Sequence, residues 1–337
     1  MSKIRRWFLT LFPACAMGVL ILDSKTALQG AAAGIELCIH SVIPSLFPFF
    51  MLSILLTNAI LVGADQKAPG RRRPGILLFL AGLLGGYPTG AQLVTQAYRN
   101  GNLSKNAARR MLGFCSNAGP SFIFGFAGQL FTKPYIPWIL WLIHILSAML
   151  LAAVIPGTTS EESLCPQQDT ITVHHAFTKS LYAIACVCGW IILFRVLIVF
   201  CDKWFLWLLP EPAAVLITGI LELTNGIFQL QNIGSEATRF ILCSVLLAFG
   251  GSCVIMQTVS VTEALGLGWY FPGKIAQSMI SGVLSGIAAH WIYGSAGIAR
   301  LLPLFVITIT FFCILIASRP KFTVDFYRSW VYNRQKS

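Results

Sequence analysis

Two long hydrophobic stretches of the chain, residues 75–97 and 205–231, are each interrupted by a short segment rich in glycine and polar residues. The first interruption reads Gly85-Gly86-Tyr87-Pro88-Thr89-Gly90 and the second reads Glu222-Leu223-Thr224-Asn225-Gly226. In hydrocarbon an unpaired backbone N–H or C=O costs several kcal/mol, so a broken helix persists there only where it lines a cavity or is buried in protein. Two such breaks in corresponding halves of a chain are typical of a binding site at the membrane midplane.

Composition supports placing these stretches in a membrane. Of the 337 residues, 56% are hydrophobic and only 11% are charged, which is more apolar surface than a soluble core can bury. The net charge of +12 comes from Lys and Arg that cluster between apolar runs, as the positive-inside rule describes. Anionic lipid headgroups, and not nucleic acid, are therefore the expected partners of these clusters.

Hydropathy and charge together predict an all-α polytopic membrane protein with about eight transmembrane helices and two re-entrant helical hairpins in an inverted repeat. Basic clusters flank residues 75–97 on both sides, so both ends prefer one face, and a break lets the segment turn back as a hairpin. An uncleaved helix over 7–22 is favoured over a signal peptide. The expected spans are residues 7–22, 35–62, 111–131, 136–156, 180–201, 239–259, 269–292 and 299–317.

This topology divides the chain into two halves of opposite orientation, with both termini in the cytoplasm of a multi-pass cell-membrane protein. The expected units are a first helix and connection (1–34), a first repeat with hairpin 75–97 (35–156), a cytoplasmic linker (157–179), a second repeat with hairpin 205–231 (180–292), and a last helix with a basic cytoplasmic tail (293–337).

Each hairpin is followed by a span with a break of its own, at residues 116–121 and 250–257. Half-helix N-termini suit a negatively charged substrate group, and unwound carbonyls suit a cation. The alternative is that Gly and Ser in these breaks only permit close helix packing. The residues expected to bind substrate in the breaks are Tyr87, Thr89, Gly90, Gln92, Ser116, Asn117, Gly119, Ser121, Glu222, Thr224, Asn225, Gly251, Ser252 and Gln257.

Two charged residues inside apolar runs stand out. A carboxylate such as Glu222 costs roughly 2.5 to 3.5 kcal/mol within a membrane helix, so it needs a cavity, a partner or a proton. We expect it to take up a coupling cation or proton, or to bind a donor group of the substrate. An ion pair with Arg195 is the alternative. Arg195 in turn either attracts an anionic cargo or extends toward an interface.

Motifs for other classes of function do not occur in the sequence. There is no HExxH, no GxxxxGK[ST] and no set of residues arranged as a nucleophile triad, so we expect neither an enzyme nor an ATP-driven pump. The ten cysteines lie singly or within apolar runs and read as small buried hydrophobes. We expect no metal and no cofactor.

Four ordered segments, residues 85–104, 109–125, 219–228 and 248–257, resemble the sporulation integral membrane proteins that carry the nucleoside-recognition gate domain. They read GGYPTGAQLVTQAYRNGNLS, RRMLGFCSNAGPSFIFG, GILELTNGIF and AFGGSCVIMQ. That family is similar in architecture to concentrative nucleoside transporters. The resemblance implies hairpin-based gating or elevator motion and a small metabolite as cargo, with dipicolinate favoured, at a membrane around the developing spore. Its motif residues map to Gly85–Gly90, Asn117, Gly119, Glu222, Thr224 and Gly250–Ser252.

The sequence therefore favours a secondary transporter that moves a small anionic metabolite by alternating access. A nucleoside or nucleobase transporter is one alternative, and a non-transporting membrane scaffold in sporulation or envelope remodelling is another. Besides the small-molecule substrate, the expected partners are a coupling cation or proton and the lipid bilayer. Inverted-repeat carriers often assemble as oligomers, so a homo-oligomer is a further expectation.

Overall fold

The chain is helical throughout the part that the structure describes. The computed structural model describes residues 3–67, 74–99, 103–155, 172–262 and 265–294. These residues form helices joined by short turns, and within them there is no β-strand. The all-α prediction is confirmed over these ranges. The expected span 299–317, the basic tail and most of the linker 157–179 lie outside the described residues.

Five helices of the described chain are long and apolar enough to cross a membrane, namely Ser24–Leu56, Ile136–Val154, Val173–Trp204, Glu236–Val261 and Tyr270–Tyr293. Each of the five overlaps one expected span. In the first span region, Pro13–Leu22 qualifies only as a short apolar helix, and the expected span 111–131 is split by its break. The prediction of about eight spans is thus supported for five.

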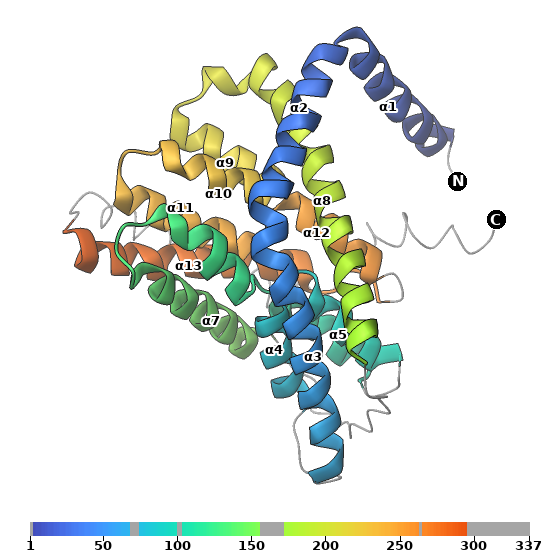
Figure 1. The fold of residues 1–337 in the computed structure, drawn as a ribbon, viewed down its shortest axis with the longest axis vertical. Coiled ribbons are helices and arrows are strands. Elements are labelled where there is room, and N and C mark those ends of the chain that lie inside the picture. Colours follow the sequence, from blue (N-terminus) through green and yellow to red (C-terminus); the bar gives the residue numbers. More distant parts are fainter. Residues whose placement is uncertain (1–2, 68–73, 100–102, 156–171, 263–264, 295–337) are drawn as a thin grey trace.

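A pair of long helical elements runs along the longest axis of the fold (Figure 1). Helix α1 (Lys3–Leu22) leads into α2 (Ser24–Leu37), which continues through a π-helical turn, Cys38–Val42, into α3 (Ile43–Lys67). The rod formed by α2 and α3 packs along α8 (Val173–Trp204). In the view of Figure 1, α1 lies on one side of this pair, and α7 (Ile136–Val154), α11 (Glu236–Phe249) and α13 (Tyr270–Tyr293) lie on the other.

The α2 helix corrects one expectation, because it begins at Ser24 and not at residue 35. Its packing against α8 explains the difference. A Cβ atom on Gly30 would lie 2.8 Å from the Cα of Val196, and one on Gly34 would lie 2.9 Å from the Cα of Ile192. The two glycines, four residues apart, let the backbones approach as in the GxxxG pairs of membrane helices. Residues 24–34 are therefore a packed helix.

After α3, the chain forms a first series of short and interrupted helices. The elements are α4 (Pro74–Gly85), α5 (Thr89–Arg99), α6 (Lys105–Cys115), the π-helical η2 (Ser121–Phe126), the 3-10 helix η3 (Ala127–Leu130) and α7 (Ile136–Val154). Ser104 caps α6 by accepting a hydrogen bond from the amide of Ala107 at 3.2 Å, as serine commonly does at an N-cap. The helix breaks fall at residues 86–88 and 116–119.

A second series after α8 has a similar order of elements. It comprises η4 (Leu206–Leu208), α9 (Glu211–Leu221), α10 (Leu223–Gln229), η5 (Leu230–Asn232), α11 (Glu236–Phe249), α12 (Gly251–Val261) and α13 (Tyr270–Tyr293). In both series a pair of short helices is followed by an interrupted helix and then by one long helix. The breaks at Glu222 and Gly250 fall where glycine and polar residues interrupt the apolar sequence.

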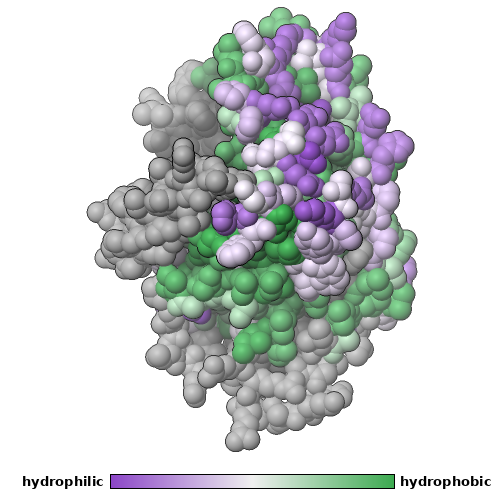
Figure 2. All heavy atoms as spheres, turned by 90° about the vertical axis from the view of Figure 1, so that its left-hand side faces the viewer, coloured by the Kyte–Doolittle hydropathy of each residue, from purple (hydrophilic) through white to green (hydrophobic). Residues whose placement is uncertain are grey.

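Apolar side chains fill the interior and also cover outer surfaces. Helix α13 packs against α6, α7 and α11 in the interior, whereas Trp138, Leu142, Leu146 and Met149 of α7 are exposed. Their spacing places them on one stripe of the helix, and an exposed apolar stripe suits lipid. On the face drawn in Figure 2, hydrophobic residues gather across the lower part of the described surface and hydrophilic residues gather above them.

Candidate functional site

The tip of the hairpin formed by α4 and α5 lies against the first helix break. Gly86 has a φ of 73°, a left-handed conformation that favours glycine, and a Cβ there would lie 3.1 Å from the amide nitrogen of Gly119. A Cβ at Gly90 would overlap the carbonyl oxygen of Cys115. This part of the site therefore depends on backbone-to-backbone contact, which a larger residue would prevent.

Glu222 occupies the second hairpin, as an extended residue between α9 and α10. Its side chain is only 2% exposed. The carboxylate accepts hydrogen bonds from the amides of Thr224 and Asn225 at 2.9 and 2.7 Å, and from the Asn225 side-chain amide at 2.7 Å. It thus acts as the N-cap of α10, where a negative charge meets the positive end of the helix dipole.

The ion pair between Glu222 and Arg195 is not formed. Across the described ranges, the one salt bridge joins Lys203 to Asp23 at 2.5 Å. The hydrogen bonds that the Glu222 carboxylate accepts all come from the first turn of α10. The N-terminus of its own helix therefore supplies the partners that a buried carboxylate needs.

The second helix break connects the two series of helices. Gly250 has a φ of 85° and ends α11, and the ring of Tyr87 packs directly against it. The Tyr87 hydroxyl donates a hydrogen bond to the carbonyl of Leu247 at 3.1 Å. The tip of the first hairpin thereby satisfies one of the carbonyls that the end of α11 leaves without an intrahelical partner.

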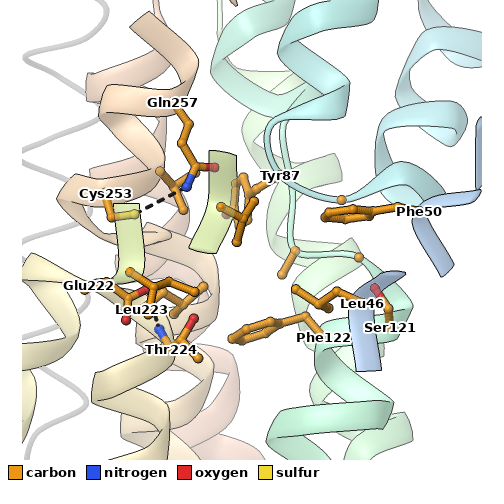
Figure 3. A pocket seen from close by; sticks show the side chains of 16 residues that line it. Leu46, Phe50, Tyr87, Ser121, Phe122, Glu222, Leu223, Thr224, Cys253 and Gln257 are labelled. Carbon is orange, nitrogen blue, oxygen red and sulfur yellow. Dashed lines mark hydrogen bonds between the residues drawn. The ribbon is translucent and has the colours of Figure 1, made fainter. Parts of the chain in front are cut away.

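A cavity of about 50 Å³ lies between these breaks. In Figure 3, Glu222, Leu223, Thr224, Cys253 and Gln257 face Leu46, Phe50, Ser121 and Phe122 across it, with Tyr87 between the two sides. Its walls are formed by Leu46, Phe50, Gly86, Tyr87, Ala118, Gly119, Ser121, Phe122, Val187, Ile191, Glu222, Leu223, Thr224, Cys253, Val254 and Gln257. Residues from both series of helices and from α3 and α8 therefore share one mainly apolar cavity with a few polar side chains.

The structure brings six of the predicted residues to the cavity wall: Tyr87, Gly119, Ser121, Glu222, Thr224 and Gln257. Others support the wall from behind. Asn117 donates to the Phe114 carbonyl at 2.7 Å, and Ser252 donates to the Ile220 carbonyl at 2.9 Å. Thr89 donates to the Gly85 carbonyl at 3.1 Å. The remaining supporting residues are Gly90, Ser116, Asn225 and Gly251.

Two predicted residues lie away from the cavity wall. Gln92 is exposed, because α5 turns Ala91, Val94 and Thr95 toward the interior and Gln92 falls on another face. Arg195 packs with its Cβ near Gly34, one turn beyond the cavity residue Ile191, where α2 covers α8. Arg195 is thus a residue of the α2–α8 contact.

Lys274 and Gln277 of α13 are the functional candidates that sequence reasoning missed. Both are fully buried. Gln277 donates to the Asn117 side-chain oxygen at 2.9 Å, and Lys274 donates to the Ser116 carbonyl. Lys274 could have been found in the sequence as a single basic residue within the expected span 269–292. Burying such a charge in a membrane is costly, so it indicates function as strongly as Glu222 does.

Metal ligands are not grouped at this site. Within the described residues, no group of three His, Cys, Asp or Glu side chains is placed to hold a metal ion. His144 is buried near the first break, but its Nε2 accepts a hydrogen bond from the Ala118 amide at 3.1 Å, so that atom is already engaged. The arrangement provides one carboxylate, amides, hydroxyls and aromatic rings around a small space.

The chain is similar to a curated bacterial protein. It matches the sporulation integral membrane protein YlbJ of Bacillus subtilis (strain 168) with 28% identity over 134 residues. The match covers 37% of this chain and 33% of that protein, so this chain aligns with about a third of its relative's length. No protein-family model matches the chain, and no solved structure matches it. The similarity and the apolar helices together support an integral membrane protein.

Proposed function

We propose that the chain is a secondary transporter that moves a small anionic metabolite by alternating access between two helical hairpins. The observation that carries this proposal is the convergence of four helix breaks, two from each series of helices, around one cavity with a buried carboxylate. We infer that α4–α5 and α9–α10 are re-entrant hairpins in oppositely oriented repeats, since both end at this cavity.

Backbone geometry supports a role in binding. Interrupted helices are tolerated at membrane depth where their freed polar groups line a cavity or contact protein, and transporters bind their substrates at such places. Here the break at Gly250 leaves the first turn of α12 without a side-chain cap. We infer that its amides can meet a negative group on a substrate once the hairpins separate. The first turn of α10 differs, because Glu222 already occupies it.

The size of the cavity supports a cycle with at least two arrangements. About 50 Å³ is room for a few water molecules, since about 10–15 Å³ of such volume holds one. Pockets for organic ligands are commonly about 300–1,000 Å³. A metabolite therefore requires the hairpins to separate. The contact between Tyr87 and the end of α11 is the natural place for that separation, since it joins one hairpin to the other series of helices.

The cavity wall favours a planar cargo. The rings of Phe50, Tyr87 and Phe122 lie around it, and aromatic rings stack on flat solutes. Dipicolinate, the aromatic dicarboxylate implied by the resemblance, meets this condition and fits the sporulation context of the relative. The negative charge of Glu222 must then be neutralised by a proton or cation before a carboxylate can approach. That requirement would couple cargo binding to a second ion.

A flux assay in proteoliposomes tests the proposal, with radiolabelled dipicolinate and, in a second arm, radiolabelled uridine. Wild-type protein should raise uptake above that of empty liposomes, and Glu222→Gln and Asn117→Ala should lower it about tenfold. Glu211→Gln is the matched control, because Glu211 is an exposed carboxylate at the start of α9 in the same hairpin. Uptake of neither probe by wild type, or equal uptake by all four proteins, would refute the proposal. Uptake of uridine alone would reassign the cargo to nucleosides.

A further inference from the structure

Lys274 is a basic residue buried inside α13 among uncharged partners. Its side chain is 0% exposed. The Nζ atom donates hydrogen bonds to the Ser116 carbonyl, to Gln277 Oε1 at 2.7 Å and to the Tyr87 hydroxyl at 3.4 Å. It lies 5.1 Å from the centre of the Tyr87 ring and 5.9 Å from that of Tyr270.

The ionisable groups that face Lys274 come from the elements packed around it. Tyr87 of the first hairpin and Tyr270 of α13 contact it directly, and Cys115 of α6 and His144 of α7 are near enough to interact with its charge. Within the described chain, Lys274 forms no salt bridge with an acidic residue. An ammonium group at this position therefore has no carboxylate to balance it.

Because no carboxylate faces Lys274, its amine can remain buried in this arrangement without the proton. Taking an ammonium ion out of water costs several kcal/mol unless an opposite charge compensates. Ser116 is the C-cap of α6, so the negative end of a helix dipole and the aromatic faces offset part of the cost. A neutral amine keeps two N–H groups, which suffice for Ser116 and Gln277, and it gives up only the longest hydrogen bond, the one to Tyr87 at 3.4 Å. The packed arrangement thus tolerates loss of the proton, and the charged form gains from hydration.

Lys274 also contacts the parts of the protein that bound the cavity. Tyr87 lines the cavity at the hairpin tip, and its hydroxyl donates to the last turn of α11. Ser116 begins the first helix break, and Gln277, one turn after Lys274, donates to Asn117 in the same break. A change of charge at Nζ therefore acts on the hairpin tip and on the helix break together.

We propose that Lys274 is a proton-binding residue that links protonation to the opening of the hairpin α4–α5. The neutral amine occupies the closed arrangement. When water delivers a proton to Nζ, the ammonium formed is better hydrated than buried, so it separates from Tyr87 and Ser116 and the tip opens. On closure, Nζ returns the proton to water. Because the open state holds the extra proton, acid favours opening and alkali favours closure. The role in transport rests on the proposed function, whereas proton binding itself does not.

Hydrogen–deuterium exchange of the full chain in lipid nanodiscs tests the proton site without any cargo. The readout is the protection of peptides covering residues 85–99, corrected for the pH dependence of exchange in an unfolded chain. In wild type we expect protection at the hairpin tip to rise about tenfold from about pH 6 to about pH 9. Protection that stays constant over this range would overturn the proposal.

Two variants and one control separate titration from packing. Lys274→Met keeps an unbranched side chain, and Lys274→Gln keeps a donor for Ser116 if the methionine variant does not fold. Neither can titrate, so protection at the tip should become independent of pH in both. Lys105→Met removes an exposed lysine at the start of α6 and should behave as wild type. A pH dependence that persists in Lys274→Gln would overturn the proposal.

Proteoliposome flux then links the proton site to transport. An inward proton gradient should raise dipicolinate or uridine uptake by wild type about fivefold, and Lys274→Gln should lose this stimulation while still exchanging labelled for unlabelled cargo. If wild type moves neither probe, the proposed function fails, and hydrogen exchange still decides whether Lys274 binds a proton. If wild type moves cargo without responding to the gradient, coupling through Lys274 is overturned and transport stands.

Discussion

Replacing Glu222 with alanine removes the acceptor for two backbone amides at the start of α10. The amides of Thr224 and Asn225 lie 2.9 and 2.7 Å from the carboxylate oxygens. If both amides were left dry, each would cost about 1–3 kcal/mol. The adjoining cavity of about 50 Å³ can admit a water molecule, however, and water would replace part of the lost interaction.

The expected cost is therefore that of an ordinary N-cap, about 1–2 kcal/mol. Local opening of α10 should become more frequent by the same free energy, which corresponds to about 5- to 30-fold faster hydrogen exchange at these two amides. Native-state exchange in nanodiscs, read on peptides covering residues 222–229, measures it directly. Glu222→Asp should keep near-wild-type rates, because aspartate is also a good N-cap.

Glu211→Ala is the matched control, since it removes an exposed carboxylate from the first turn of α9. It should leave the exchange of the Thr224 and Asn225 amides unchanged. Wild-type exchange rates at those amides in Glu222→Ala would show that the carboxylate does not hold the helix start. The capping role described for Glu222 would then be wrong.

Two further predictions concern the contact between α2 and α8. Gly34→Leu should destabilise the protein by about 1–3 kcal/mol, because a Cβ there would lie 2.9 Å from the Ile192 Cα. Thermal unfolding in detergent measures this loss of stability. Gly189→Ala is the control that should stay near wild type, because a Cβ at Gly189 meets nothing within 4 Å. The hydrogen bond from Lys203 lowers the pKa of the Asp23 carboxyl below its usual value of about 4. The pair therefore stabilises α2 fully at pH values above about 4. This contribution is lost as the pH falls through the lowered pKa. Asp23→Asn should abolish that acid-dependent part of the unfolding temperature, and an unchanged acid dependence in Asp23→Asn would contradict the assignment.

Helix breaks were predictable because their cause is local. Glycine, proline and asparagine within an apolar run mark helix ends without reference to the rest of the fold. The structure accordingly ends α4 at Gly85 and α11 at Phe249, and it places Glu222 between two helices. The long apolar spans were predictable for the same reason, since hydropathy is summed over neighbouring residues.

Cavity residues were only partly predictable, because a helix turns side chains to every side and only its neighbours decide which face is inside. Gln92 lies one residue after the buried Ala91 and is exposed. Arg195 was expected to attract cargo, yet α2 covers its part of α8 through Gly34. Sequence spacing says nothing of which helix will pack on which face.

From the sequence alone came the membrane class, the all-helical fold and the positions where helices must break, because hydropathy and glycine or proline act over a few consecutive residues. Tertiary structure decided that Tyr87 reaches Leu247 and that Lys274 lies against Ser116. These pairs include residues about 160 positions apart, as for Tyr87 and Leu247. Only the packing of α13 against α6 and the approach of the hairpin tip to the end of α11 bring such groups within hydrogen-bonding distance.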